Sequence, residues 1–254
     1  MIILLGKIKP VIMVRGFGDL ANELNKKVIV ALDVENKEKA LGLARKLQGS
    51  GCWLKVGLEL YSIEGPAVLR ELKELGFPVF LDLKLHDIPN TVERAIRGLV
   101  SWGADIINVH CSGGYEMMAR AAEAVRTLPG SGGKTRLIGV TVLTSLSEKV
   151  LQDDLGVGRS LEDQVLGLAK LAQRAGLDGV VASAREAAAL RQACGQEFLL
   201  VTPGIRPAWS EQNDQVRILT PREAIAAGSS YLVVGRPVTR AADPLEALNR
   251  LWEE

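Results

Sequence analysis

The sequence predicts an α/β protein that folds as a single (β/α)8 TIM barrel. From Lys27 onward, short apolar runs alternate about eight times with amphipathic helical stretches, over roughly 225 residues, as such a barrel requires. The apolar runs are continuous in Val, Ile and Leu, which is typical of parallel strands covered on both faces. Several helical stretches also end in a Gly that suits a helix C-cap.

The expected elements follow one another in a regular order. Strands are expected at residues 28–33, 53–57, 79–84, 106–110, 137–142, 179–182, 198–202 and 231–235. Helices are expected between them, including residues 37–47, 65–75, 92–102, 115–127, 161–175 and 184–193. Gly76, Gly103, Gly176 and Gly228 follow helical stretches and precede strands by a few residues, as αβ loops do. A doubly wound open sheet is the alternative, but the G-x-G-x-x-G pattern is absent after Asp33.

Length and charge are those of an ordinary globular protein. We assign residues 27–254 to one barrel domain and residues 1–26 to an N-terminal extension without an assigned function. The net charge of +1, from 31 basic and 30 acidic residues, gives no general attraction to nucleic acid or to an anionic membrane. No apolar run reaches the roughly 18 residues that span a bilayer. An anionic ligand would therefore have to be bound by a local cluster of side chains.

The cysteines and histidines do not form a metal-binding pattern. Cys52, Cys111 and Cys194 lack metal-ligand spacing, and the chain has only two histidines, His86 and His110. We therefore expect no metal, reduced thiols and a cytoplasmic location. His110 at a strand end is interpreted as a hydrogen-bonded residue of the barrel mouth, and the role of His86 stays open.

Charged residues gather where the first three strands end. Asp33 ends the first strand, Lys55 lies on the second, and Asp82 and Lys84 end the third, with Asp87 in the loop that follows. A barrel keeps its chemistry at the carboxyl ends of its strands. Charges on buried strands are costly unless they are paired, so several at neighbouring strand ends indicate one shared site.

Strand parity places two of these charges on one face. Asp82 and Lys84 are two residues apart and face the barrel interior, because Leu81, Leu83 and Leu85 occupy the helix-facing positions. Lys55 on the neighbouring strand would extend them into a row of alternating charges. A carboxylate neighbour keeps a lysine protonated and able to act as a general acid, and a fixed carboxylate repels a substrate carboxylate. The alternative interpretation is a buried ion-pair network that only sets strand register.

Two Gly- and Arg-containing loops predict a phosphate site. The seventh strand is followed by Gly204 and Arg206, and the eighth by Gly235 and Arg236. Barrels often bind phosphate with these two loops, where Gly admits the anion to the backbone and Arg matches its oxygens. Residues 207–215 form a long, polar segment that is expected to act as a lid. A solvated surface loop with incidental arginines is the alternative.

The third-strand segment resembles the signature of the bacterial orotidine 5′-phosphate decarboxylase family. That segment is Asp82-Leu83-Lys84-Leu85-His86-Asp87-Ile88-Pro89-Asn90-Thr91. Further pieces in family order are Val30-Ala31-Leu32-Asp33, Leu54-Lys55-Val56-Gly57, Val140-Thr141-Val142-Leu143-Thr144-Ser145, Thr202-Pro203-Gly204-Ile205-Arg206, Asp214-Gln215-Val216-Arg217 and Val233-Val234-Gly235-Arg236-Pro237. The resemblance covers nearly all of residues 28–250 and implies a decarboxylase that makes UMP, the last step of pyrimidine synthesis, without a metal or other cofactor.

The resemblance also implies roles for the charged row. Lys84 would donate a proton to C6 of the pyrimidine after carbon dioxide leaves, and Asp82 would stand beside the departing carboxylate. Lys55 and Asp33 would hold ribose hydroxyls and the charged row. Thr144 would lie near the pyrimidine.

The remaining implied roles concern the phosphate and a second subunit. Arg206, Gln215, Gly235 and Arg236 would bind the phosphate, with Gln215 on the mobile loop. The resemblance further implies a homodimer with shared active sites, in which Asp87 and Thr91 reach into the site of the partner.

Two rival functions stay open on the sequence. A metal-dependent sugar-phosphate decarboxylase or lyase on a related barrel would need a carboxylate at the end of the second strand, where this chain has Lys55. A non-catalytic nucleotide-binding protein would bind UMP without turning over orotidine 5′-phosphate.

Overall fold

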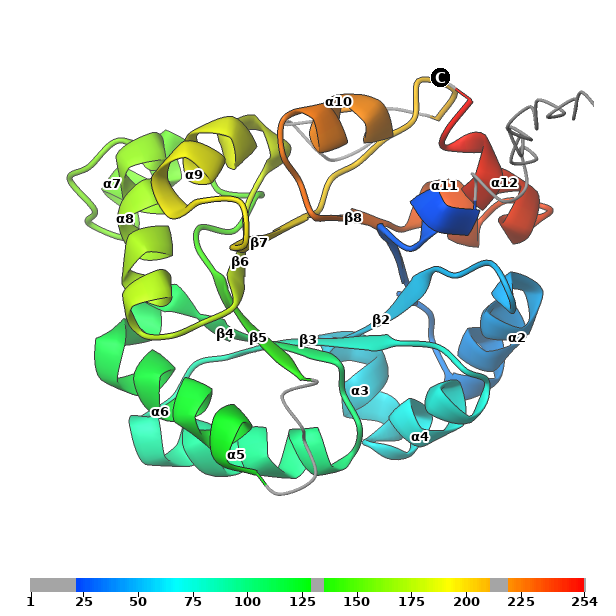
Figure 1. The fold of residues 1–254 in the computed structure, drawn as a ribbon, viewed down its shortest axis with the longest axis horizontal. Helices are drawn as coiled ribbons and strands as arrows, with labels where there is room; N and C mark the ends of the chain where they lie inside the picture. The colour runs from blue at the N-terminus through cyan, green and yellow to red at the C-terminus, as the bar shows by residue number, and fades with distance from the viewer. Residues whose placement is uncertain (1–21, 129–134, 211–218, 254) are drawn as a thin grey trace, which may run out of the picture.

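The chain folds into a closed barrel of eight parallel strands, which confirms the predicted (β/α)8 architecture. The structure, a computed structural model, describes residues 22–128, 135–210 and 219–253. Successive strands are neighbours all the way round, and the first pairs with the last to close the ring (Figure 1). The strands are β1 (Val28–Ala31), β2 (Trp53–Gly57), β3 (Val79–Leu85), β4 (Ile106–His110), β5 (Arg136–Val140), β6 (Gly179–Val181), β7 (Leu199–Thr202) and β8 (Tyr231–Val234).

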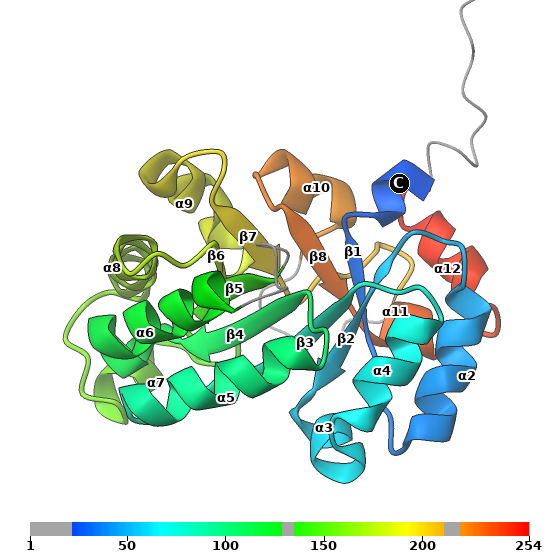
Figure 2. The same cartoon turned by 60° about the horizontal axis from the view of Figure 1, so that its bottom comes forward.

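Helices surround the barrel on its outside, as Figures 1 and 2 show from two directions. They are α2 (Lys37–Leu47), α3 (Leu58–Glu64), α4 (Ala67–Glu74), α5 (Pro89–Ser101), α6 (Gly114–Thr127), α7 (Glu148–Asp153), α8 (Leu161–Arg174), α9 (Ala187–Cys194), α10 (Pro221–Ala226), α11 (Arg236–Thr239) and α12 (Pro244–Arg250), with 3-10 turns η1 (Cys111–Gly113) and η2 (Ala184–Glu186). The expected stretch at 65–75 is confirmed as α4. The short helices α3, α7, α10, α11 and α12 were not among the stretches predicted.

The predicted glycine caps are confirmed by their backbone angles. Gly76, Gly103, Gly176 and Gly228 all have positive φ, between 85° and 108°. A side chain is disfavoured there, because only Gly adopts the left-handed region without strain. Each of these glycines turns the chain from a helix or helical turn back towards the next strand, so the sequence pattern correctly marked these αβ connections.

The barrel core has two apolar layers that leave one end open to polar residues. Ile29, Phe80, Ile106, Ile138 and Val201 form a small buried cluster distinct from the large one that also contains the helices' apolar residues. Side chains on a strand alternate between its faces, so the residues two places after Phe80 and Ile106 also point inward. Those residues are polar, and they lie towards the carboxyl ends of the strands. The apolar cluster therefore supports a polar layer above it.

The pairing of β3 with β4 contains a bulge beside this polar layer. Leu81 pairs with Ile107 and Leu85 pairs with Val109. Between these two pairs, β3 advances by four residues while β4 advances by two. Within the bulge, Lys84 has a φ of 54° and is the one non-glycine residue with positive φ in the described ranges. Bulges re-aim side chains and are common near active sites.

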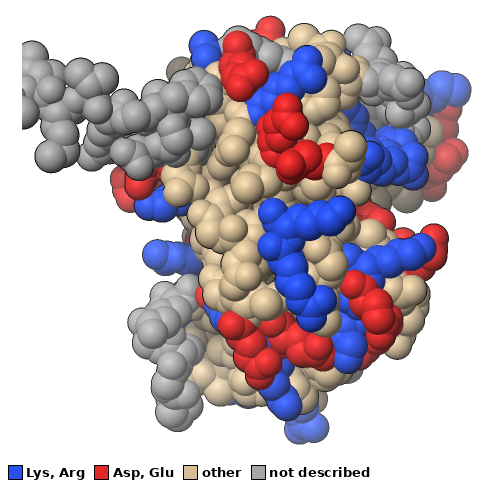
Figure 3. Space-filling view, turned by 90° about the vertical axis from the view of Figure 1, so that its right-hand side faces the viewer, with Lys and Arg blue, Asp and Glu red and all other residues tan. Residues whose placement is uncertain are grey.

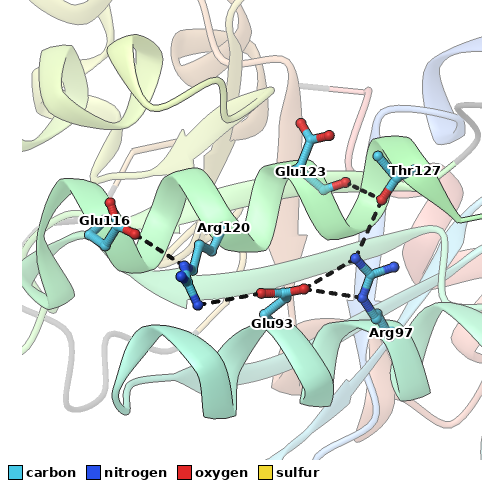
Figure 4. A network of polar contacts seen from close by, with 6 residues as sticks. All are labelled: Glu93, Arg97, Glu116, Arg120, Glu123 and Thr127. Atoms are coloured by element: carbon cyan, nitrogen blue, oxygen red, sulfur yellow. Dashed lines mark hydrogen bonds and ion pairs between the residues drawn. The ribbon is translucent and has the colours of Figure 1, made fainter.

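Helix α5, which begins two residues after Asp87, is fastened to α6 by a network of polar contacts (Figure 4). Arg120 on α6 lies 3.0 Å from Glu116 and 3.8 Å from Glu93 on α5. Arg97 on α5 donates to Glu93 at 3.1 Å and to the hydroxyl of Thr127 at 3.5 Å. These contacts are largely exposed and therefore contribute little to stability. We infer that they mainly orient the two helices.

The described chain begins just before β1 and packs against its own C-terminal end. Within the predicted extension, Asn25 is buried, donates to Asn249 at 2.9 Å and accepts from the Trp252 indole at 2.9 Å. Basic and acidic side chains are interspersed on the face shown in Figure 3. Among the described residues, no helix is long and apolar enough to cross a membrane.

Candidate active site

A cavity of about 760 Å³ opens at the carboxyl ends of the strands. Its walls come from β1 to β3 and from the segments that follow β5, β7 and β8. Eight residues predicted for the site line it: Asp33, Lys55, Asp82, Lys84, Thr144, Arg206, Gly235 and Arg236. The cavity lies where a barrel keeps its chemistry, and it brings together both halves of the predicted site.

Charged residues on or just after β1 to β3 form an alternating row, which contains the Lys55, Asp82 and Lys84 that strand parity predicted and also Asp33. The Lys55 Nζ lies 3.0 Å from Asp33 Oδ1 and 3.3 Å from Asp82 Oδ2. On the far side of Asp82, its Oδ1 lies 2.7 Å from the Lys84 Nζ. The order is therefore Asp33, Lys55, Asp82, Lys84, with unlike charges adjacent throughout. Four such charges sum to zero, which keeps the row neutral as a unit.

Burial is concentrated in the middle of the row. The side chains of Lys55 and Asp82 are 11% and 12% exposed, whereas those of Asp33 and Lys84 are 61% and 35% exposed. The two central charges thus have little water to solvate them and depend on their neighbours. The end members face the cavity, where a ligand can reach them.

The neighbours decide the ionisation of the two central groups. Burial alone would lower the pKa of Lys55, but the carboxylates of Asp82 and Asp33 outweigh it and raise the pKa above its usual value. Burial alone would raise the pKa of Asp82, but Lys55 and Lys84 outweigh it, and the pKa is lowered. Lys55 is therefore a fixed cation and Asp82 a fixed anion at neutral pH.

Another part of the cavity wall carries the two arginines that follow β7 and β8. Arg206 is almost completely buried, and its Nη1 donates to the Ile205 carbonyl at 3.1 Å. Arg236 begins α11 directly after Gly235. Gly204, with a φ of 78°, turns the chain between β7 and Arg206. This part of the wall brings the side chains of Arg206 and Arg236 to the same cavity as the row.

Two predicted site residues, Asp87 and Thr91, do not line the cavity of their own chain. Asp87 and Thr91 are exposed, and the Asp87 Oδ1 accepts from the backbone N–H of Ile88 at 2.6 Å. Neither residue joins the charged row of its own chain. Gln215, and with it most of the predicted lid, lies outside the described residues.

The two histidines form a pair near the row. Their ring centroids are 5.4 Å apart at an interplanar angle of 40°. His110 ends β4 and is half-buried, and burial lowers its pKa, with further contributions from His86 and Lys84. His110 is therefore neutral at pH 7. Its position agrees with a residue of the barrel mouth.

Two residues that support the row were not assigned a role from the sequence. Asn108, fully buried on β4, donates from Nδ2 to Asp82 Oδ1 at 2.7 Å. Gly57 faces the row, and a Cβ there would lie 3.0 Å from the Lys55 Nζ and 3.4 Å from Asp33 Oδ1. The signal for Gly57 was available, since it lies two residues after Lys55. An Asn inside an otherwise apolar strand was the corresponding signal for Asn108.

In the described part of the chain, no three His, Cys, Asp or Glu side chains are grouped so that they could hold a metal ion. Fold and site together define a (β/α)8-barrel enzyme whose cavity is lined by an ionic row and by arginines. Residues 26–251 match the family described as "Orotidine 5'-phosphate decarboxylase / HUMPS family". The chain belongs to this family.

Individual relatives agree with this assignment. The orotidine 5'-phosphate decarboxylase of Nitrosococcus oceani is 51% identical over 228 residues, covering 90% of this chain and 97% of the relative. That of Bacillus caldolyticus is 52% identical over 227 residues, covering 89% and 93%. The crystal structure of orotidine 5'-phosphate decarboxylase from Lactobacillus acidophilus superposes with a TM-score of 0.80 at 39% identity, covering 89% of this chain and 97% of that one.

Proposed function

We propose that this protein converts orotidine 5′-phosphate to UMP and carbon dioxide, the last step of UMP biosynthesis, without a metal or organic cofactor. The observation that carries the proposal is the uninterrupted row of Asp33, Lys55, Asp82 and Lys84 on one wall of the cavity. Relatives whose sequences are 51% and 52% identical to this chain, over about nine-tenths of its length, bear the name of this enzyme.

The row supplies the groups that the reaction needs. The bond from C6 of the pyrimidine to its carboxylate breaks, the electron pair stays on C6, and Lys84 transfers a proton from Nζ to that carbon. Asp82 is held ionised by two lysines, so it repels a substrate carboxylate placed beside it. Lys84 also stabilises the negative charge as it develops, because its cation is already in place. Thr144 would lie near the pyrimidine.

The other parts of the substrate extend across the cavity. Asp33 and Lys55 hold ribose hydroxyls, and Arg206, Gly235 and Arg236 hold the phosphate, joined by Gln215. Arginine forks match phosphate oxygens, and all the named residues except Gln215 line the same cavity. Binding the phosphate remotely from C6 supplies free energy that orders the substrate against the charged row.

The test of the function is a UV assay of orotidine 5′-phosphate consumption in excess EDTA. The wild type should keep its full activity in EDTA. Lys84→Ala should reduce kcat by about 10²- to 10⁴-fold while UMP still binds. Lys73→Ala is a matched control, because Lys73 pairs with Asp105 at 2.6 Å and is 34% exposed, against 2.7 Å and 35% for Lys84, yet it does not line the cavity.

Each rival function predicts a different result in this assay. Activity lost in EDTA and restored by magnesium would support the metal-dependent rival. UMP binding without any turnover would support the nucleotide-binding rival. Near-normal turnover by Lys84→Ala would mean that another group is the proton donor.

We further propose a homodimer in which Asp87 and Thr91 complete the site of the partner. Both are exposed and outside their own cavity, and the neighbouring Ile88 is 65% exposed, as an interface would require. Leu58 and Ile63, at 62% and 57%, are further apolar residues open to solvent.

Shared sites can be tested by mixing two inactive variants. A heterodimer of Lys84→Ala with Asp87→Ala has one site with both changes and one intact site. After random reassortment of equal amounts, half of the dimers are mixed, so about a quarter of wild-type activity should return. No recovery after confirmed subunit exchange would contradict shared sites.

A further inference from the structure

Asn108 connects the two residues of the row to which the chemistry is assigned. It lies on β4 with no exposed surface and does not line the cavity. Its Nδ2 donates to Asp82 Oδ1 at 2.7 Å, and its Oδ1 accepts from the backbone N–H of Lys84 at 2.7 Å. If the Asn108 amide were reversed, its NH₂ group would face the Lys84 N–H and its oxygen would face the Asp82 carboxylate. The hydrogen-bond partners therefore fix the orientation of the amide.

The contact with Lys84 falls inside the bulge of β3. Leu81 and Leu85 are paired with the backbone of β4, but the residues between them are displaced from the regular register. Lys84 is also held at a φ of 54°, a conformation that a residue with a Cβ disfavours. The side chain of Asn108 takes the place of a ladder acceptor for the Lys84 N–H. This hydrogen bond favours the conformation that aims the Lys84 side chain at Asp82.

The contact with Asp82 supplies a donor without adding a charge. The charged and titratable groups facing Asp82 are Lys55 from β2, Lys84 from its own strand and His110 from β4. With Asp33, the row already balances two anions against two cations. A third cation at position 108 would upset that balance, and a carboxylate would repel Asp82. An uncharged amide hydrogen-bonds Asp82 and leaves the balance unchanged.

We propose that Asn108 is a positioning residue that holds the Asp82 carboxylate and the Lys84 backbone in their reactive arrangement. The inference rests on the proposed function, because it assigns the reaction to Asp82 and Lys84. Asn108 itself touches neither the cavity nor the reacting atoms, so its effect on the rate is exerted through these two partners.

Two variants separate the two contacts. Asn108→Ala removes both, whereas the nearly isosteric Asn108→Asp keeps an acceptor for the Lys84 N–H and replaces the donor to Asp82 by a repelling charge. The matched control is Asn25→Ala, since Asn25 is equally buried and also makes two side-chain hydrogen bonds, but with Asn249 and Trp252 next to the C-terminal end.

Three measurements distinguish positioning from a structural role. Asn108→Ala should lower kcat by about 10- to 100-fold, as a small misplacement of reacting groups does, with KM changed by less than about threefold. The pKa of the Asp82 carboxyl, followed by ¹³C NMR, should rise in both variants. Asn25→Ala should lower the melting temperature while kcat and the Asp82 pKa stay at wild-type values.

The outcomes separate this inference from the proposed function. A folded Asn108→Asp protein with wild-type kcat and an unchanged Asp82 pKa would overturn the inference, even if Asn108→Ala failed to fold. Equal loss of kcat in Asn25→Ala would do the same. If the wild type does not turn over orotidine 5′-phosphate, the proposed function fails, and the Asp82 pKa in the two Asn108 variants still decides whether Asn108 controls that carboxylate.

Discussion

Replacing Lys55 by Met tests whether the centre of the charged row depends on its neighbours. Met keeps a long side chain and removes the cation. Lys55 lies 3.3 Å from Asp82 and 3.0 Å from Asp33, and only Asp82 is buried as deeply as Lys55 itself. The variant therefore leaves Asp82 buried with Lys84 as its one remaining lysine partner.

The size of the effect follows from these distances. At an effective dielectric constant of about 20, two charges 3.3 Å apart attract by about 5 kcal/mol. The exposed Asp33 adds at most about 1 kcal/mol, because solvent screens it. Removing Lys55 also removes the cost of burying its charge, which offsets part of this loss. Breaking a buried ion pair by removing one partner typically costs about 3–5 kcal/mol in total. We expect Lys55→Met to lose about 3–5 kcal/mol of unfolding free energy at pH 7.

The loss should depend on pH with a definite sign. The pKa of Asp82 is lowered in the folded protein, so its stabilising contribution is present above the unfolded pKa of about 4 and is lost as pH falls through the folded pKa. In the variant, we expect that folded pKa to rise above the unfolded value, because burial acts against fewer opposing cations. The difference between wild type and variant should therefore shrink as pH falls from 7 towards 4.

Urea unfolding followed by circular dichroism, at fixed protein concentration, measures this difference. Lys73→Met is the control and should lose no more than about 1 kcal/mol, since its ion pair is partly exposed. Adding Asp82→Asn to Lys55→Met should restore at least about half of the loss. A loss below about 1 kcal/mol at pH 7, or no recovery in the double variant, would refute the reasoning.

Two further predictions concern packing and thiol reactivity. Gly179→Ala would place a Cβ 2.2 Å from the Leu199 carbonyl oxygen and should lower the free energy of unfolding by about 3 kcal/mol or prevent folding. The control is Gly42→Ala on α2, where a Cβ would meet no atom within 4 Å. This change should raise the free energy of unfolding by about 0.5–1 kcal/mol. A wild-type melting temperature for Gly179→Ala would contradict the close contact. Burial raises the pKa of Cys52 to about 11 and that of Cys111 to about 12, so native protein at pH 8 should react slowly with Ellman's reagent and denatured protein with all three thiols. Rapid labelling of these two thiols in native protein would show that they are accessible.

The barrel was predictable from the repeated alternation of apolar strands with helices, and the charged row from the alternation of side chains along one strand. Side chains alternate on a strand, so Asp82 and Lys84 had to share a face once Leu81, Leu83 and Leu85 were assigned to the other. The C-cap glycines were predictable because few residues tolerate positive φ. Lys84 also has positive φ, at 54°, and nothing in its residue type indicates this.

The parts that were missed depend on relations between strands. A period-two pattern tells which face a residue occupies, but it does not give the register against the next strand. The bulge between β3 and β4 places Asn108 against Asp82 and the Lys84 N–H, and neither contact can be read from β4 alone. The short helices α10 and α12 span only one or two turns, too few for a helical period to stand out.

The pairing of β1 with β8 has a consequence for how the protein is made. The row comes from β1 to β3, but Gly235 and Arg236 follow the last strand, and Val28 pairs with Leu232 across the seam. During synthesis, a chain that has left the ribosome only as far as β7 carries every charge of the row and lacks the part of the cavity wall that follows β7 and β8. The binding site is completed with the final fold. A ligand held across the seam then binds only the closed barrel, so each bound molecule also opposes the opening of the ring.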